Sequence, residues 1–493
     1  MSFIDLKEKM LSKGFTQKDF EEFLYKIGFG SDEEKVNTPE LDLVEKEAHL
    51  NDQLEKARQA KEQNFYFRDK KENLVPQYYK LAYYLRDEFG FMCKDKYIWA
   101  YNGKFYEYKS NEQLQNIVTD LTKDQASPNH LSGFVKIAIA KNQTNKELIH
   151  PQGFINLENG TLELKSRKLK EHSKKDFFRY CLPIQYDESA KCPRFLKYLE
   201  ETFQGDQELI RLTFQIYGYC LMGGDPFLHK AFVLLGSGRN GKSVWLHVLK
   251  GLLGKANHSA VSIGLLNKPF SVVQMDGKLA NIVGELTTGV IDSESFKTAV
   301  GGEELTASLK GKDEFGLKID ARMLFASNAM PVFKDTTAGM YEKLCILPFD
   351  RYLKPSERDP GIFKAVSKEL PGILNLALEG LEYVMTHKRL IEPKASKLKI
   401  EEYRDDSDIT YRWISENLEI TENRADIVLT SMIYDKFRYD TMNETWQPLT
   451  KRSFGRRISQ YLKTYDSKTP NANFAYSNGK ARGFVGVRYS GND

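Results

Sequence analysis

Cysteine is scarce in this sequence, and long apolar runs are missing from it. The five cysteines are Cys93, Cys181, Cys192, Cys220 and Cys345. They are too widely scattered for the CxxC spacing of a zinc site or for a dense disulfide framework, which predicts reduced thiols in a cytoplasmic protein. No apolar run approaches the roughly 18 residues that cross a bilayer, and the first ten residues mix acids with bases where a signal peptide is apolar. We therefore expect a soluble globular protein with no membrane partner.

A strong overall charge is also missing. The net charge of +4 is too small to separate a nucleic-acid binder from an ordinary enzyme. The charge is unevenly distributed, however, because residues 450–490 contain nine Lys or Arg and the single acid Asp466. Phosphate binding would explain such a concentration. The basic character therefore points to the C-terminal segment.

The chain length predicts two to four packed domains. Residues 1–65 form a helical, charged N-terminal region, with Thr16 as a helix cap, which we interpret as a solvated helix or linker; a contact with DNA or another subunit is the alternative. Residues 66–195 form an α+β domain, in which Asn102-Gly103 predicts the type I′ turn of a β-hairpin. Residues 196–228 have helical periodicity and predict a small helical collar.

Residues 231–254 contain the most specific motif. An apolar strand runs into Gly236-Ser237-Gly238-Arg239-Asn240-Gly241-Lys242-Ser243, and an amphipathic helix follows. This is GxxxxGK[ST] in a strand-loop-helix context, whose backbone N–H groups surround phosphate oxygens. Gly236, Gly238, Asn240 and Gly241 are the predicted nucleotide-binding residues of this loop. We expect Lys242 to reach the β- and γ-phosphates of ATP, and Ser243 to bind Mg²⁺.

Two further apolar strands end in polar residues. Residues 278–286 end near Glu285, which is placed to hold the metal and orient a water molecule. Residues 321–331 contain Asn328, which is either a simple strand cap or a group that hydrogen-bonds the γ-phosphate. Lys242, Glu285 and Asn328 follow in the order that adjacent strands of one parallel sheet would present.

The order and spacing of these motifs resemble superfamily 3 helicases, an AAA+ branch, and most closely the helicase part of phage and plasmid primase-helicases of mobile elements. The resemblance covers most of residues 95–350 and includes INLENGTLEL, YDESAKCPRFLKYLEE, FKTAVGGEELTASLKGK and FASNAMP. It implies an α/β, AAA+ P-loop domain over residues 229–400, in which Glu285 is the Walker B acid and Asn328 the first sensor. It also implies a hexameric ring with single-stranded DNA in its channel and 3′ to 5′ movement.

The resemblance assigns two more elements. The stretch between Glu285 and Asn328 would be a loop or hairpin that grips DNA through Lys310 and Lys312; a solvated basic turn is the alternative. Lys343 stands where the family typically has the arginine finger that completes a neighbouring site. Lysine lacks the bidentate fork of arginine, so Lys343 acts as the finger, or Arg322 or Arg351 serves, or turnover is slow.

Residues 405–493 resemble a winged-helix domain. Its basic helix would enter the major groove of duplex DNA through Lys451, Arg452, Arg456 and Arg457, with Lys480 and Arg482 on the wing. A solvated basic face or a subunit contact is the alternative.

Together these features predict an ATP- and Mg²⁺-dependent replicative helicase of a phage, plasmid or mobile element. It would load itself at duplex origin DNA and could meet host replication proteins. One alternative is a protein that is also a primase, although no additional acid-rich polymerase or zinc-ribbon segment is present upstream. A second is a DNA-bound AAA+ regulator or scaffold with little unwinding, which Lys343 supports.

Overall fold

The structure is a computed structural model that describes most of residues 64–490. Within this range the structure does not describe residues 95–96, 124, 145–150, 287–289, 292, 312, 334–337, 408, 422, 424, 443–448, 467–474 and 478–481. The N-terminal region with Thr16, and both Lys312 and Lys480, therefore lie outside the described residues. The chain forms two compact units, one with residues 1–100 and 108–145 and one with residues 101–107 and 146–493. This division falls inside residues 66–195, which we predicted as one domain.

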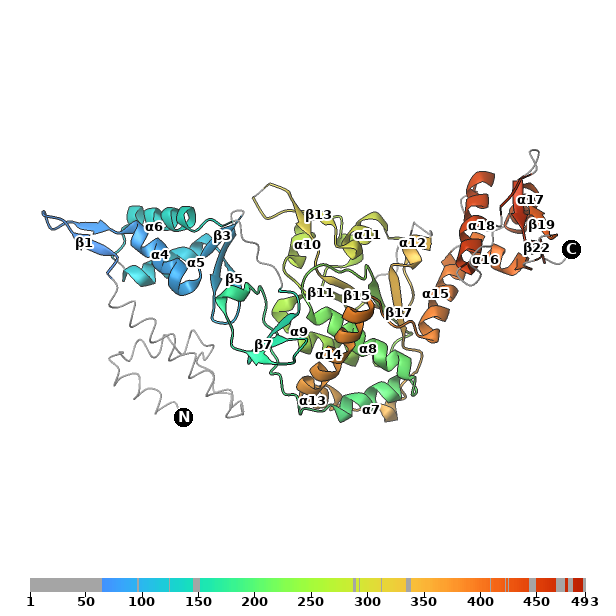
Figure 1. The fold of residues 1–493 in the computed structure, drawn as a ribbon, viewed down its shortest axis with the longest axis horizontal. Helices are drawn as coiled ribbons and strands as arrows, with labels where there is room; N and C mark the ends of the chain where they lie inside the picture. Colours follow the sequence, from blue (N-terminus) through green and yellow to red (C-terminus); the bar gives the residue numbers. More distant parts are fainter. Residues whose placement is uncertain are drawn as a thin grey trace. The chain divides into compact units, whose positions relative to one another are not determined.

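The first unit packs helices on small sheets (Figure 1). Its elements are β1 (Tyr66–Arg68), β2 (Leu74–Pro76), α4 (Tyr78–Phe89), β3 (Met92–Lys94), β4 (Tyr97–Tyr101), β5 (Tyr106–Lys109), α5 (Asn111–Thr122) and α6 (Pro128–Lys141). The Ser110 and Ser127 side chains accept backbone N–H groups at the starts of α5 and α6. Buried residues of α4, α5, α6, β3 and β4 form one apolar core.

The predicted turn between β4 and β5 is present, but it is not type I′. Type I′ requires a positive φ at both central residues, and only Gly103 has one, at +103°. The Asn102 side-chain oxygen instead accepts the backbone N–H groups of Lys104 and Phe105 at 3.0 and 2.9 Å. These bonds stabilise a longer connection, because an asparagine side chain can take the place of a backbone turn.

The second unit begins with a small antiparallel sheet and a helical layer. These are β6 (Phe154–Leu157), β7 (Gly160–Glu163), β8 (Leu169–Lys170), α7 (Pro193–Thr202) and α8 (Gln207–Leu221). The helices expected in residues 196–228 are thus present as α7 and α8. A Cβ at Gly218 of α8 would lie 2.1 Å from the Ala377 carbonyl oxygen, so α8 crosses α14 (Leu370–His387) at very short range. The helices share one core with β6, β7 and the central sheet.

A five-stranded parallel sheet forms the centre of this unit. Its strands are β9 (Ala231–Leu235), β10 (His258–Ser259), β11 (Ala280–Val283), β15 (Arg322–Ser327) and β17 (Leu344–Pro348), in the order β10-β11-β15-β9-β17. All pairs are parallel. β9 runs into α9 (Lys242–Leu253). The predicted α/β fold with a parallel sheet is therefore confirmed.

Shorter elements surround the sheet. They are α10 (Pro269–Val272), β12 (Val290–Ile291), α11 (Ser293–Gly301), β13 (Glu304–Ala307), β14 (Phe315–Lys318), β16 (Val332–Phe333), α12 (Ala338–Tyr341), α13 (Ile362–Ser367) and α15 (Lys394–Ser407). None of the helices in the described part of the chain is long and apolar enough to cross a membrane.

The C-terminal part has its own core of buried residues from three helices and two small sheets. Its elements are α16 (Ile409–Asn417), β18 (Leu418–Ile420), β19 (Ile427–Leu429), α17 (Thr430–Asp440), α18 (Lys451–Asp466), β20 (Ala475–Ser477), β21 (Arg482–Val485) and β22 (Val487–Tyr489). β21 lies between β19 and β20, and β18 pairs with β22. The predicted basic helix is present as α18, and Arg482, predicted on the wing, is the first residue of β21.

Candidate functional site

The glycine-rich loop connects the end of β9 to the start of α9. A Cβ on Gly236 would lie 2.2 Å from the Asn240 side-chain nitrogen and 2.3 Å from the Phe349 carbonyl oxygen, so only glycine fits there. Gly241, which precedes α9, has a φ of +95°, a conformation that glycine adopts without a steric penalty. The loop therefore has the close backbone packing and the helix N-terminus that a phosphate site needs.

Lys242 points back into this loop. Its Nζ donates a hydrogen bond to the Gly236 carbonyl oxygen and another, of 3.3 Å, to Oδ1 of Asn328. Only 9% of the residue is exposed. Burial lowers the pKa of the Lys242 ammonium, and the negative charge of Glu285 acts in the opposite direction. The sequence-predicted residues Lys242, Glu285 and Asn328 therefore lie close enough to influence one another.

The strand order explains how these residues meet. β15 lies between β9 and β11, and all three strands run in the same direction. Asn328 follows β15, and Glu285 follows β11, where the Leu286 backbone N–H donates to the Ala326 carbonyl at 3.0 Å. Both side chains are exposed. The carboxyl ends of the three strands thus present an ammonium, a carboxylate and an amide at one edge of the sheet.

Two other predicted loop residues differ in their surroundings. Ser243 is exposed at the second position of α9, where its hydroxyl is accessible. Asn240 is 3% exposed, and its side chain donates a 2.9 Å hydrogen bond to the Phe349 carbonyl oxygen. The Asn240 side chain therefore holds the loop against the end of β17, and any contact of this residue with a nucleotide is left to its backbone.

Residues 349–358 also contact the loop, which the sequence did not reveal. The Leu353 backbone N–H donates to the Arg239 carbonyl at 2.9 Å. A hydrogen bond with the Arg239 side chain, and the charges of Arg239 and Arg358, lower the pKa of Tyr352. On another side of the loop, the Tyr198 hydroxyl donates to the Gly241 carbonyl at 2.9 Å. Strand pairing brings residues 349–358 to the loop, because β17 is parallel to β9 and ends at the same edge of the sheet. Only the topology of the sheet could have indicated this contact.

The three candidates for the trans-acting cation have different positions. Lys343 is half-buried and directly precedes β17, so it lies at the amino edge of the sheet, about 15 Å of strand away from the edge that carries Lys242. Arg322 is 1% exposed and donates to the Gly224 and Asp320 carbonyls at 2.6 and 2.8 Å. Arg351 follows β17 at the carboxyl edge and bonds the Glu201 carbonyl and the Glu357 carboxylate.

These positions separate the candidates. Arg322 is buried, so its guanidinium is not accessible at the surface. Arg351 lies on the same edge of the sheet as the glycine-rich loop. Lys343 lies at the opposite edge and cannot reach that loop of its own chain.

The expected DNA-gripping segment is an antiparallel hairpin of β13 and β14. Leu305, Phe315 and Leu317 pack against the apolar core on one face. Lys310 is exposed in the connection, where Gly311 has a φ of +74°. Asp313 and Glu314 are exposed in the same connection, and Glu303 and Glu304 are exposed at the opposite end of the hairpin.

Residues 79–204 match the D5 N terminal like family, and residues 234–339 match a family of unknown function (DUF5906). The second range contains the loop, Glu285 and Asn328. The chain is 24% identical over 313 residues to the putative helicase L207/L206 of Acanthamoeba polyphaga mimivirus. This match covers 58% of this chain and 32% of that protein. It is 22% identical over 223 residues to the putative helicase 121R of Invertebrate iridescent virus 3, and this match covers 42% of this chain and 24% of that protein.

The chain is therefore similar to viral proteins named as putative helicases, and part of it matches the D5 N terminal like family. The matched regions span about a third and a quarter of the lengths of the two viral proteins. Two solved apo structures of the NrS-1 C-terminal region are also similar, with TM-scores of 0.48 and 0.46. Each is 13% identical, and each comparison covers 83% of this chain and 98% of the other.

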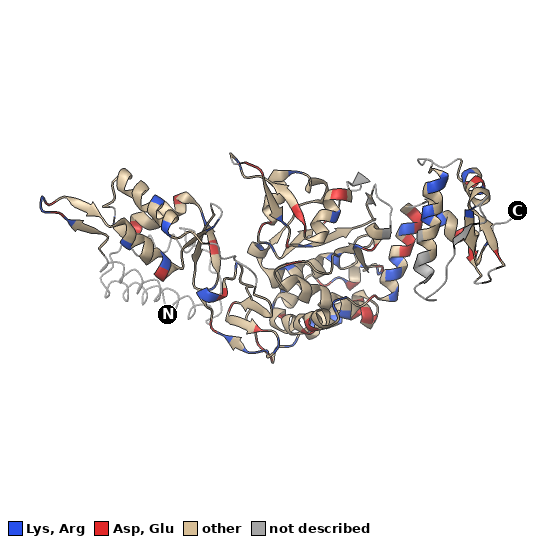
Figure 2. Ribbon diagram, turned by 45° about the horizontal axis from the view of Figure 1, so that its top comes forward, with Lys and Arg blue, Asp and Glu red and all other residues tan. Residues whose placement is uncertain are grey.

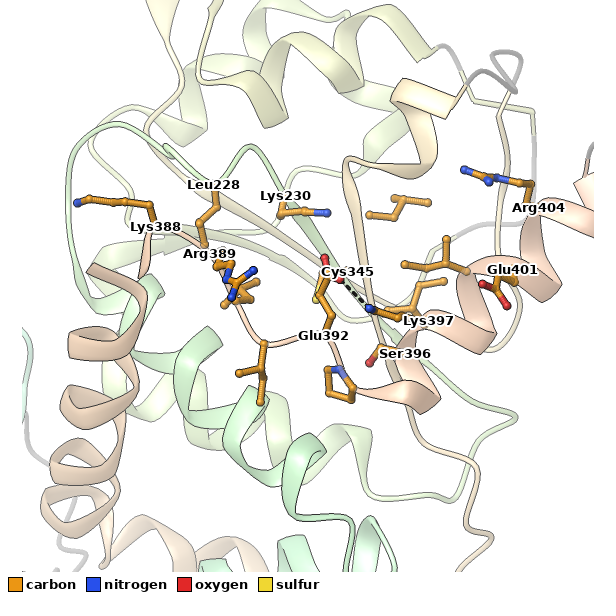
Figure 3. Close-up of a pocket in the computed structure, with 16 residues that line it drawn as sticks. Leu228, Lys230, Cys345, Lys388, Arg389, Glu392, Ser396, Lys397, Glu401 and Arg404 are labelled. Carbon is orange, nitrogen blue, oxygen red and sulfur yellow. Dashed lines mark ion pairs between the residues drawn. The ribbon is translucent and has the colours of Figure 1, made fainter. Parts of the chain in front are cut away.

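A cavity of about 380 Å³ lies beside β17 at the amino edge of the sheet, away from Lys242. Its lining includes Leu344, Cys345 and Ile346 of β17 and residues 388–393. Figure 3 shows cationic and anionic side chains around it and the 3.1 Å ion pair between Lys397 and Glu392. The cavity is therefore separate from the predicted nucleotide site.

The C-terminal basic residues are distributed over α18 and β21. Figure 2 shows Lys and Arg positions along the helices near this end of the chain. Phe454, Ile458 and Leu462 of α18 are buried. Arg452 and Arg456 are exposed, four residues apart, on the face of α18 away from that core.

The other residues predicted to contact DNA differ in how exposed they are. Lys451 and Arg482 are exposed, whereas Arg457 is half-buried. The predicted basic face of α18 is therefore present in part.

Proposed function

We propose that this chain is an ATP-driven DNA helicase of the superfamily 3 type that acts in the replication of a phage, plasmid or similar element. The observation that carries the proposal is the meeting of Lys242, Glu285 and Asn328 at the carboxyl edge of one parallel sheet. The named viral helicases among its relatives support it. The sheet around these residues is then an AAA+ P-loop core.

The donor set suits a nucleoside triphosphate with Mg²⁺. Backbone N–H groups of residues 236–243 and the start of α9 favour phosphate oxygens, and Lys242 supplies a partly desolvated positive charge. The accessible Ser243 hydroxyl and the Glu285 carboxylate would hold Mg²⁺, which supplies charge neutralisation when bound. Glu285 would also orient the attacking water molecule, and the Asn328 amide would donate to the γ-phosphate.

We further propose that six copies form a ring around single-stranded DNA. In this arrangement the connection between β13 and β14, with Lys310 and Lys312, faces the channel. Lys343 would act on the nucleotide of a neighbouring subunit, because it lies at the edge of the sheet opposite its own site.

The C-terminal part is proposed to be a winged-helix domain that binds duplex origin DNA. The exposed pair Arg452 and Arg456 on α18 supports this role. Binding by this domain would let the protein load itself at an origin.

A DNA-bound regulator is the second candidate, and Lys343 favours it. A lysine at the finger position cannot form the planar, bidentate contact of arginine with a phosphate, so turnover could be too slow for a motor. Such a protein would use nucleotide binding as a switch.

Strand separation on a forked DNA tests the proposal. Wild type and Lys242→Ala are compared with ATP and Mg²⁺, while duplex binding is measured in parallel. We expect unwinding by wild type only and duplex binding by both. ATP hydrolysis by wild type without strand separation, under conditions where it binds the fork, would favour the regulator.

The channel hairpin has its own test. Replacing Lys310 and Lys312 together by alanine should reduce the stimulation of ATP hydrolysis by single-stranded DNA, with the DNA-independent rate unchanged. Normal stimulation of the double variant would contradict the assignment of this hairpin.

A further inference from the structure

Helix α4 of the first unit carries an exposed stripe made of Tyr79, Tyr83 and Arg86. These residues are spaced i, i+4 and i+7, so they share one face of the helix. Leu81 and Leu85, on the opposite side, are buried in the core. The stripe therefore belongs to a face that the described residues of this unit leave uncovered.

The two tyrosines expose much of their surface. Tyr79 is 52% exposed and Tyr83 is 41% exposed. Single exposed apolar residues are ordinary on protein surfaces, whereas neighbouring exposed aromatic rings mark interaction sites more often. Each ring also has a cation beside it: Nζ of Lys141, at the end of α6, lies 5.2 Å from the Tyr79 ring centre, and the guanidinium carbon of Arg86 lies 5.0 Å from that of Tyr83.

The unit that carries the stripe has an excess of basic residues, which favours an anionic ligand. The described residues of this unit outside 101–107 contain ten Lys or Arg and six Asp or Glu. Arg86 donates two hydrogen bonds to the Asp87 carboxylate, of 2.8 and 3.2 Å. Both side chains are more than half exposed, so water screens this pair and a phosphate can compete for the guanidinium. Lys141 is exposed at the end of α6. A ligand with flat rings and a negatively charged backbone fits this combination.

We propose that Tyr79, Tyr83, Arg86 and Lys141 form a binding site for single-stranded DNA that is additional to the hairpin of β13 and β14. Bases would stack on the open faces of the two rings, and the two cations would contact backbone phosphates. Positions i and i+4 of a helix are about 6 Å apart along its axis, which an unstacked strand can span between consecutive bases. Stacking requires no base-specific hydrogen bond, so the site is tolerant of sequence. The site would hold a separated strand without using ATP.

The test measures equilibrium binding of the full chain to a fluorescently labelled oligo-dT without nucleotide. Lys310→Ala/Lys312→Ala serves as the parent, so that the hairpin does not contribute. Adding Tyr79→Ala and Tyr83→Ala should weaken binding by about tenfold or more, because each base–ring stack contributes substantially to affinity. Tyr79→Phe with Tyr83→Phe should bind like the parent, since the rings remain.

Two controls make the result decisive. Phe363→Ala removes a ring of similar exposure on α13 and should leave binding unchanged. Oligomeric state is followed by light scattering for every variant. Unchanged DNA affinity in the tyrosine-to-alanine variant overturns the proposal, and a change of oligomeric state alone would identify the stripe as a protein contact instead. Because no ATP is present, the result is independent of whether the chain unwinds DNA.

Discussion

Nζ of Lys242 lies 3.3 Å from Oδ1 of Asn328, although 86 positions separate the two residues in the chain. The contact exists because β9 and β15 are adjacent and parallel, so the loop after one strand meets the residue after the other. Glu285 joins them from β11, the next strand of the sheet. The proposed catalytic chemistry depends on this meeting of three strand ends.

Asn328→Ala should slow ATP hydrolysis without preventing ATP binding. Removing one preorganised hydrogen-bond donor from a developing charge typically reduces kcat by about 100-fold. We expect a loss of this order, with KM changed by less than about threefold. Steady-state hydrolysis assays provide both constants, and a kcat near that of wild type would contradict the sensor role.

Gly236→Ala should abolish nucleotide binding. The added Cβ would lie 2.2 Å from the Asn240 side chain and 2.3 Å from the Phe349 carbonyl oxygen, so the loop would have to move. Gly264→Ala is the matched control, because nothing lies within 4 Å of its Cβ position. Titration with a fluorescent ATP analogue should show binding by the control and none by Gly236→Ala; equal binding by both would contradict the role of loop packing.

Lys343→Ala should lower ATP hydrolysis only in assembled protein. Since Lys343 lies at the edge opposite its own loop, it can contribute only to the site of another subunit. We therefore expect that the rate of ATP hydrolysis by Lys343→Ala no longer rises with protein concentration. Lys343→Arg should hydrolyse ATP at least as fast as wild type, because arginine offers a bidentate contact. Hydrolysis is measured across a concentration series for all three proteins. If the hydrolysis rate of Lys343→Ala rose with protein concentration as the wild-type rate does, the proposed role of Lys343 would be contradicted.

Arg452→Ala with Arg456→Ala should weaken duplex binding and make it less sensitive to salt. Each phosphate contact adds about one unit to the slope of log K against log salt, so the slope should fall by about two. Lys364→Ala with Lys368→Ala is the control, because it removes the same charge from two exposed positions, one in α13 and one directly after it. A shared reduction in both double variants would indicate a general charge effect.

The cysteine thiols should react slowly in the folded protein. Burial raises the pKa of Cys93, Cys181, Cys192, Cys220 and Cys345 to about 12. Only the thiolate reacts, so at pH 8 about one thiol in 10,000 is in the reactive form. A disulfide reagent should detect less than about one thiol in native protein and five in guanidinium chloride. Rapid reaction of several native thiols would contradict this burial.

The sequence alone was sufficient to predict the local elements of the proposed nucleotide site. A GxxxxGK[ST] loop between an apolar strand and an amphipathic helix specifies its own geometry, because its glycines and helix start lie within about twenty residues. Glu285 and Asn328 could be predicted as candidates for the same reason, since each is a polar residue that follows an apolar strand. The basic character of α18 was likewise visible as a run of charges.

Tertiary structure decided the contacts that depend on strand pairing. The pairing of β17 with β9 brings residues 349–358 to the loop and uses the Asn240 side chain to hold that contact. The same pairing places Lys343 at the far edge of the sheet and Arg351 at the near one. Packing also buried Arg322, which looked equivalent to the other two candidates. Such outcomes are set by contacts between segments far apart in the chain, for which local periodicity carries no signal.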